Sequence, residues 1–258
     1  MDAFRRTLRL FQGPDEGSKG LVFLVHGFLG SRVQMVPLAG RLWRGGWDVV
    51  NYGYPTRRHT LEDHALALLD VVRSNIDRTK PETVHFVSHS FGGVVLRAAL
   101  KHPDCPEFAQ NGRIVLVAPP IRGSSFARAL KRLPQPLNRL ASIVVGTASG
   151  SQLMERPQTW YDASGGFPKR AKVLLICGNM GRINPWIDGD SDGVVALNET
   201  QVVTPHRRIE LRVTHNLLMY HSKVIDAATR FLNGEDDIGE KGFFHPLDDL
   251  AESQKGAI

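Results

Sequence analysis

Short runs of apolar, mostly β-branched residues alternate along this chain with longer stretches in which apolar residues recur every three or four positions. The first pattern predicts buried β-strands, and the second predicts helices with one apolar face. Strands are expected at Thr7–Phe11, Leu21–His26, Asp48–Tyr52, Val84–Ser88, Ile114–Val117, Val173–Cys177 and Ile209–Val213. This alternation is typical of βαβ units. The sequence therefore predicts an α/β fold with a mostly parallel, doubly wound sheet flanked by helices on both faces.

The predicted helices have recognisable ends. They are expected from Ser31 to about Trp43, after the pair Thr60 and Asp63, from Phe91 to about His102, and from about Met219 to Leu232. Thr60 and Asp63 form a capping-box pattern, and Asn233-Gly234 is a typical helix stop. Each helix falls between two predicted strands or after the last one, as βαβ units require.

The stretch Ile121–Pro168 interrupts this alternation with several prolines and a Gly/Ser-rich segment, GTASGS. An insertion of this size between strands is usually functional, often as a lid over a site. A mobile lid and a rigid covering subdomain both fit the pattern. We expect one α/β domain over residues 1–232 with a helical lid or cap at about 121–168, and a loosely ordered acidic tail over 233–258.

Composition and charge narrow the function classes. The chain has 258 residues, of which 42% are hydrophobic and 22% charged, so a globular protein with a large core is expected. The net charge is +6, although the tail after Leu232 holds seven acidic residues and two lysines. The basic body is compatible with a weak contact with an anionic lipid surface. No nucleic-acid motif accompanies the charge, so we expect no nucleic-acid partner.

Cysteines and apolar runs bear on the cellular setting. Two cysteines exclude a disulfide framework and a cysteine-based metal cluster, so a reduced, cytoplasmic location is expected. The longest apolar runs, such as Leu21–Val25, are far shorter than the ~20 residues that span a bilayer. Arginines interrupt the N-terminal stretch MDAFRRTLRLFQGPDEG, which argues against a signal peptide.

The clearest chemical signal is the stretch Ser88-His89-Ser90-Phe91-Gly92-Gly93, which follows a predicted strand and begins a helix. Such a tight turn lifts the Ser90 hydroxyl clear of the sheet, provided that the residues two before and two after it are small. The Phe91 N–H at the start of the helix can bind negative charge that develops on a substrate. Ser90 is therefore the predicted nucleophile.

A second backbone donor is expected in the loop that follows the strand Leu21–Val25, which reads HGFLGS. We assign the Phe28 N–H to this role, with Leu29 as the neighbouring alternative. His26 is expected to hold the loop by hydrogen bonds.

HGFLGS, then SHSFGG, then an acid and a histidine in that order, resembles the α/β-hydrolase fold. Within it, the chain is similar to bacterial lipases and esterases related to small secreted Bacillus-type lipases, over about residues 20–232. The resemblance implies a serine hydrolase with a Ser, Asp, His order along the chain. Ser88, where the usual pattern has glycine, and the insertion at 121–168 depart from that pattern.

The resemblance implies an acid in the loop after the strand Val173–Cys177, which offers Asp188, Asp190 and Asp192. Similar lipases place the acid directly before a short apolar stretch such as Val194-Val195, which selects Asp192 and leaves Asp190 second. The three aspartates, with Gly193 and Glu199, also match a calcium-loop pattern. Such a loop needs a helix on each side, and the flanking sequence predicts none, so no metal and no cofactor are expected.

The base is expected after the last strand. His215, in the stretch THNLLMY, resembles the family's histidine loop. His221 is the weaker candidate because it falls near the predicted helix start, and His89 is expected to serve local packing.

These residues predict a carboxylic ester hydrolase that uses Ser90, His215 and Asp192 through an acyl-enzyme, on a small-molecule acyl ester. Thioesterases, amidases and acyltransferases use the same triad, and a non-catalytic α/β-hydrolase scaffold used for binding is a further alternative. The sequence leaves the acyl-chain length and the oligomeric state open.

Overall fold

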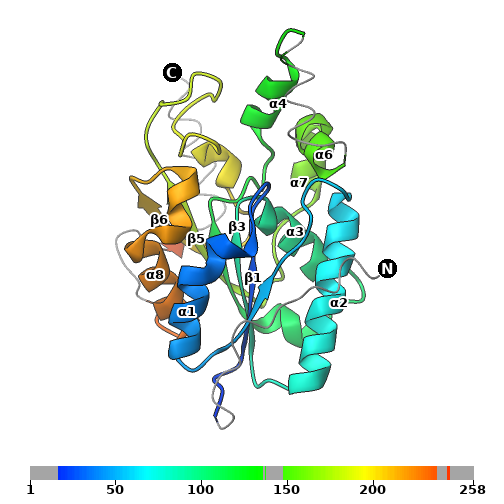
Figure 1. Cartoon of the computed structure of the whole chain (residues 1–258), viewed down its shortest axis with the longest axis vertical. Helices are drawn as coiled ribbons and strands as arrows, with labels where there is room; N and C mark the ends of the chain where they lie inside the picture. Colours follow the sequence, from blue (N-terminus) through cyan, green and yellow to red (C-terminus); the bar gives the residue numbers. More distant parts are fainter. Residues whose placement is uncertain (1–16, 136, 138–147, 237–242, 245–258) are drawn as a thin grey trace.

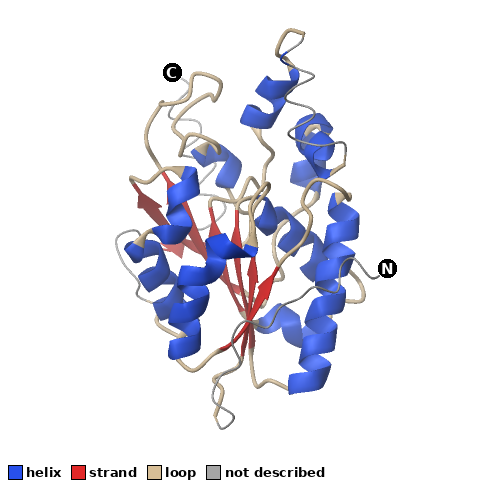
Figure 2. Ribbon diagram, in the orientation of Figure 1, coloured by secondary structure: helices blue, strands red, loops and turns tan. Residues whose placement is uncertain are grey.

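The computed structural model describes residues 17–135, 137, 148–236 and 243–244. Within these ranges a seven-stranded sheet has the order β2-β1-β3-β4-β5-β6-β7 (Figure 2). The strands are β1 (Leu21–Val25), β2 (Asp48–Tyr52), β3 (Val84–His89), β4 (Arg113–Val117), β5 (Lys172–Gly178), β6 (His206–Leu211) and β7 (Phe243–Phe244). The first six are parallel, and β7 is antiparallel to β6. The strand predicted at Thr7–Phe11 lies outside the described residues.

The helices follow the predicted order. They are α1 (Val36–Arg44), α2 (Leu61–Thr79), α3 (Phe91–Leu100), α4 (Ser125–Lys131), α6 (Ser149–Glu155), α7 (Gln158–Ala163) and α8 (Ser222–Leu232). Short 3₁₀ helices span Arg32–Met35, Glu107–Asn111, Leu197–Thr200 and His215–Tyr220. The predicted capping box is confirmed, because the Asp63 N–H donates to Thr60 Oγ1 (3.1 Å) and the Thr60 N–H donates to Asp63 Oδ2 (3.0 Å).

Helices cover both faces of the sheet, with α1 and α8 on one face and α2 and α3 on the other (Figure 1). Alternate residues of β1 enter opposite cores, Phe23 toward α2 and α3 and Leu24 toward α1 and α8. Phe23 stacks on Phe86 of β3 at 5.5 Å between ring centroids. Burial on both faces explains why the strands read as continuous apolar runs. The predicted doubly wound fold is confirmed.

Three predicted boundaries near the end of the chain are wrong. β6 begins at His206 rather than Ile209, and it ends at Leu211, because the Val213 N–H turns back to the Leu211 carbonyl (2.8 Å). The last helix begins at Ser222 rather than Met219, since the preceding residues form a 3₁₀ helix. Local turns that no apolar period reveals decide both ends.

The described part of the Ile121–Pro168 insertion contains α4, α6 and α7, which lie beyond the carboxyl ends of the strands (Figure 1). The side chain of Gln152 on α6 accepts from the Leu61 N–H (2.7 Å) at the start of α2. Lys101 Nζ donates to the Ser164 carbonyl (2.7 Å) just after α7. The described part of the insertion is helical, and its role as a lid or cap stays a prediction.

Only residues 233–236 and 243–244 of the acidic tail are described, and the loose order expected of the tail stays a prediction. Asp236 pairs with Arg113 (2.8 Å) and Lys172 (3.0 Å), and these two partners lower its pKa to about 2. β7 adds to the sheet edge beside β6. Arg113 at the start of β4 and Lys172 at the start of β5 therefore hold Asp236 near the amino ends of these two strands. No helix in the described ranges is long and apolar enough to cross a membrane.

Candidate active site

The three residues predicted to act in catalysis come from loops at the carboxyl ends of three strands. Ser90 directly follows β3, Asp192 lies in the loop after β5, and His215 follows β6. Parallel strands bring their carboxyl ends to one edge of the sheet, where α/β proteins form their sites. The fold therefore brings together residues that are far apart in the sequence.

Ser90 has the backbone conformation of a strained elbow. Its φ is +53° and its ψ is −129°, in a region that L-residues rarely adopt. The Ser90 N–H donates to the Val117 carbonyl at the end of β4 (2.8 Å), and the Ser90 carbonyl accepts from Gly93 (2.9 Å) in α3. These two bonds fix the strained turn and leave the hydroxyl free to face His215.

His215 connects Ser90 to Asp192 through its two ring nitrogens. Its Nδ1 lies 2.7 Å from Asp192 Oδ2, and its Nε2 lies 2.9 Å from Ser90 Oγ. A carboxylate only accepts, so Nδ1–H donates to Asp192 and Nε2 is left to accept from the Ser90 hydroxyl. This is the tautomer that can remove a proton from Ser90.

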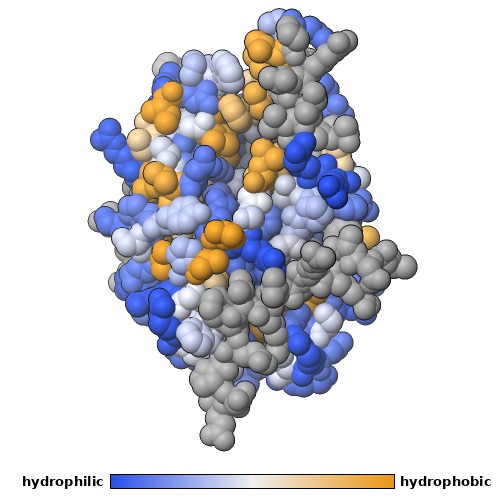
Figure 3. Space-filling model, viewed as in Figure 1, coloured by the Kyte–Doolittle hydropathy of each residue, from blue (hydrophilic) through white to orange (hydrophobic). Residues whose placement is uncertain are grey.

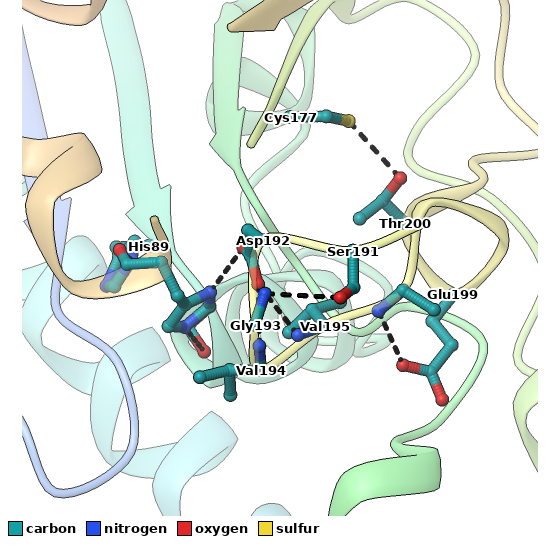
Figure 4. A network of polar contacts seen from close by, with 12 residues as sticks. His89, Cys177, Ser191, Asp192, Gly193, Val194, Val195, Glu199 and Thr200 are labelled. Carbon is teal, nitrogen blue, oxygen red and sulfur yellow. Dashed lines mark hydrogen bonds and ion pairs between the residues drawn. The ribbon is translucent and has the colours of Figure 1, made fainter. Parts of the chain in front are cut away.

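Hydrogen bonds within its own loop fix the side chain of Asp192 in its position beside His215. Its Oδ1 accepts from the N–H groups of Val194 (3.0 Å) and Val195 (2.8 Å), and its backbone carbonyl accepts from His215 (3.0 Å). Figure 4 shows this short turn around the carboxylate. Asp192 is only 2% exposed, whereas Asp188 and Asp190 are exposed. The structure thus brings Asp192, rather than the alternative Asp190, to His215.

Asp192, which belongs to the calcium-loop pattern of the sequence, has other partners in the structure. Both carboxylate oxygens of Asp192 are used, one by the loop and one by His215. In the part of the chain that the structure describes, His, Cys, Asp and Glu side chains form no group of three or more that could hold a metal ion.

The loop after β1 lies directly against Ser90. A Cβ on Gly27 would come 2.8 Å from the Ser90 Cβ, so only glycine allows this approach. The Leu29 N–H, the alternative oxyanion donor, already donates to Thr56 Oγ1 (3.1 Å). The Phe28 N–H has no acceptor among the described residues, and Phe91 begins α3, where first-turn N–H groups lack helical acceptors. The geometry thus favours Phe28 over Leu29 as partner to Phe91.

The other histidines near the site have local partners. His26 Nδ1 donates to the Gly27 carbonyl (2.9 Å), and its ring stacks on Tyr54 at 4.5 Å. His89 Nε2 donates to the His215 carbonyl (3.3 Å). Burial lowers the pKa of both rings, so both are neutral near pH 7. His221 accepts from the Lys223 N–H (3.3 Å) at the start of α8, away from the serine.

A pocket of about 790 Å³ opens beside Ser90 and His215. Most of its lining is apolar and comes from three places: Phe28, Leu29 and Val33 after β1, Phe126, Ala127 and Leu130 of α4, and Val194 and Val195 of the loop that carries Asp192, here called the acid loop. Figure 3 shows that apolar residues gather mainly in the upper half of this view of the molecule. Ser90 therefore faces a cavity suited to an apolar group.

A sequence model described as the alpha/beta hydrolase family matches residues 22–236. The chain belongs to this family.

Solved structures with a similar fold include bacterial lipases and esterases. The Bacillus licheniformis lipase BlEst2 in its propeptide form has a TM-score of 0.72 and 19% identity, over 90% of this chain and 54% of that one. This chain thus spans about half the length of the propeptide form. The mature form gives a TM-score of 0.66 and 20% identity, over 86% and 92% of the two chains. The Bacillus subtilis carboxylesterase CesB gives 0.55 and 17%, over 86% of each chain. No curated protein sequence matches this chain.

The structure also reveals residues of this α/β-hydrolase site that sequence reasoning missed. Thr56 binds the loop after β1, and Glu199 binds the acid loop through the Ala196 N–H (3.0 Å). The sequence shows Glu199 only as the last position of the calcium-loop pattern. Nothing in the sequence around Thr56 indicates its contact with Leu29, because Leu29 lies 27 residues earlier.

Proposed function

We propose that this α/β-hydrolase cleaves carboxylic esters through a covalent acyl-enzyme on Ser90. The observation that carries the proposal is the continuous chain from Asp192 through His215 to Ser90, with contacts of 2.7 and 2.9 Å, at the edge of an apolar pocket. The lipase and carboxylesterase among the similar structures agree with this chemistry.

The first half of the reaction forms the acyl-enzyme. His215 Nε2 removes the Ser90 proton as Oγ attacks the ester carbonyl carbon. The N–H groups of Phe28 and Phe91 stabilise the oxyanion of the tetrahedral intermediate. Asp192 stays ionised and stabilises the imidazolium. His215 then protonates the leaving alcohol oxygen as the C–O bond breaks.

The second half releases the acid. His215 removes a proton from water as the water attacks the acyl-enzyme, and it then returns that proton to Ser90 Oγ. Because alcohol, thiol and amine leaving groups all depart by this route, the triad geometry also fits thioesters, amides and acyl transfer. The apolar lining from Phe126, Leu130 and Val33 favours esters with an apolar acyl chain.

Hydrolysis of p-nitrophenyl esters from C2 to C16 tests this function. Replacing Ser90 with alanine is expected to lower kcat by about four to six orders of magnitude, because no nucleophile remains. Ser88→Ala is the matched control. It removes a buried hydroxyl from the same turn, and this hydroxyl has no hydrogen-bond partner among the described residues. We expect Ser88→Ala to stay within about threefold of wild type, as a neutral unpaired hydroxyl contributes little.

Two results would contradict the proposal. One is wild-type turnover in the Ser90→Ala protein. The other is the absence of activity on every ester length, which would shift the assignment to another acyl substrate or to a binding scaffold.

The partner and the location expected from the sequence stay predictions. Contact with an anionic lipid surface and a cytoplasmic location are still proposed, the latter because Cys105 and Cys177 are free thiols. Vesicle co-sedimentation at increasing salt concentration tests the lipid contact, which salt should weaken.

A further inference from the structure

One wall of the pocket is a helix with little burial of its own. α4 spans Ser125–Lys131 and buries none of its residues completely, yet its Phe126, Ala127 and Leu130 line the pocket beside Ser90. A helix this short is unstable alone, so its position depends on tertiary contacts. The contacts that fix its first turn therefore decide the shape of this wall.

The main contact at that turn is the carboxylate of Glu199, which is only 6% exposed. Glu199 Oε1 accepts from the Ser125 N–H, a first-turn donor that has no helical partner, and lies 3.6 Å from the Arg128 guanidinium. The backbone carbonyl of Glu199 accepts from the Arg122 N–H (3.0 Å) just before the helix. Glu199, beyond β5, thus contacts the start of α4 through two backbone N–H groups and the Arg128 charge.

The second oxygen of the same carboxylate holds the opposite wall. Glu199 Oε2 accepts from the Ala196 N–H (3.0 Å), and Ala196 pairs with Ser191 across the loop that carries Asp192. That loop also supplies Val194 and Val195 to the pocket. Figure 4 shows Asp192 and Glu199 on the two sides of this loop.

Burial of a carboxylate is costly unless its oxygens are bound. Burial raises the pKa of Glu199, while the N–H donors of Ala196 and Ser125 and the Arg128 charge oppose that rise. The two N–H donors bind different oxygens of Glu199, so both oxygens must accept for both contacts to persist. Glutamine accepts at one oxygen and presents an NH₂ to the other donor, so it can hold one wall but not both.

We propose that Glu199 is a positioning residue that holds α4 against the acid loop and thereby sets which acyl chains the pocket accepts. This inference rests on the proposed ester hydrolysis. A short acetyl group needs only the space beside Ser90, whereas a longer chain must contact the α4 wall. Loosening Glu199 should therefore act on long chains far more than on acetate.

Two variants loosen the α4 contact in different ways. Glu199→Gln removes one of the two accepting oxygens. Ser125→Pro removes the N–H that Glu199 binds, together with the Ser125 hydroxyl. The change falls at the first helical position, where proline is tolerated, and after Ser124, which is already extended (φ −138°, ψ 106°). Glu155→Gln is the matched control, because Glu155 also binds α4, through Lys131 (3.2 Å), but on the exposed surface.

The measurement is kcat and KM for p-nitrophenyl acetate and octanoate. In both Glu199→Gln and Ser125→Pro we expect the octanoate-to-acetate ratio of kcat/KM to fall about tenfold, mostly through a higher KM for octanoate. Glu155→Gln should keep the wild-type ratio. Thermal melting reports whether each variant is folded, and Ser125→Pro decides the matter if Glu199→Gln does not fold.

The inference is overturned if folded Ser125→Pro keeps the wild-type ratio within twofold while hydrolysis still depends on Ser90. If hydrolysis survives in Ser90→Ala, the proposed function itself fails. Ser125→Pro thus tests the role of Glu199, and Ser90→Ala tests the proposed function.

Discussion

Replacing Asp192 with asparagine is expected to lower kcat for ester hydrolysis by about 10⁴-fold with little change in the fold. Asparagine can keep its oxygen toward the N–H groups of Val194 and Val195, which the carboxylate now binds at 3.0 and 2.8 Å. Its NH₂ then faces His215 Nδ1 and can only donate. The imidazole must place its proton on Nε2, toward Ser90, and can no longer act as a base.

The control for this variant is Asp190→Asn, in the same loop. Asp190 is exposed and its side chain has no contact with His215, so kcat should stay within about twofold of wild type. Steady-state kinetics on p-nitrophenyl butyrate compares the two. An equal loss in both variants, or a loss only in Asp190→Asn, would show that the acid is wrongly assigned.

Gly92→Ala is expected to destabilise the protein strongly. An alanine Cβ would lie 2.5 Å from the Val25 carbonyl oxygen and 2.6 Å from that of His26, and neither backbone atom can move freely. Separating α3 from β1 should lower the free energy of unfolding by about 3 kcal/mol or more. It should also shift the loop with Phe28 away from Ser90 and reduce kcat.

Gly40→Ala provides the comparison for that loss. Gly40 lies inside α1, and its new Cβ would meet only the Arg44 guanidinium, at 3.9 and 4.0 Å. Alanine favours the helix there, so the protein should gain about 0.5–1 kcal/mol. Urea unfolding at pH 7 measures both variants. A Gly92→Ala protein as stable as wild type would mean that the close approach of α3 and β1 is wrong.

Much of the fold and the candidate triad could be predicted because each depends on local sequence. Apolar runs such as that of β1 mark parallel strands that are buried on both faces. The spacing around Ser90 dictates a strained turn between a strand and a helix, and the structure shows its positive φ. The position of Asp192 before Val194-Val195 came from resemblance, and the hydrogen bonds of the loop give it a physical basis.

Features that depend on distant partners could not be predicted. Ser125 lies 74 residues before Glu199, and nothing in either local stretch indicates that they meet. The same holds for Asp236, whose pairing with Arg113 spans 123 residues and holds part of the tail. The predicted boundaries of β6 and α8 were wrong for a different reason. A turn ends β6 at Leu211, and a 3₁₀ helix takes the place of the first residues predicted for α8.

Covalent labelling with a fluorophosphonate, followed by peptide mass spectrometry, tests the central claim most directly. An activated serine Oγ displaces fluoride and stays bonded to phosphorus, whereas an ordinary serine does not react. We predict one adduct per chain on the peptide that holds Ser90, a much slower reaction in Asp192→Asn, and none in Ser90→Ala. A wild-type protein that remains unlabelled, or an adduct that persists in Ser90→Ala, would contradict the assignment of Ser90 as the nucleophile.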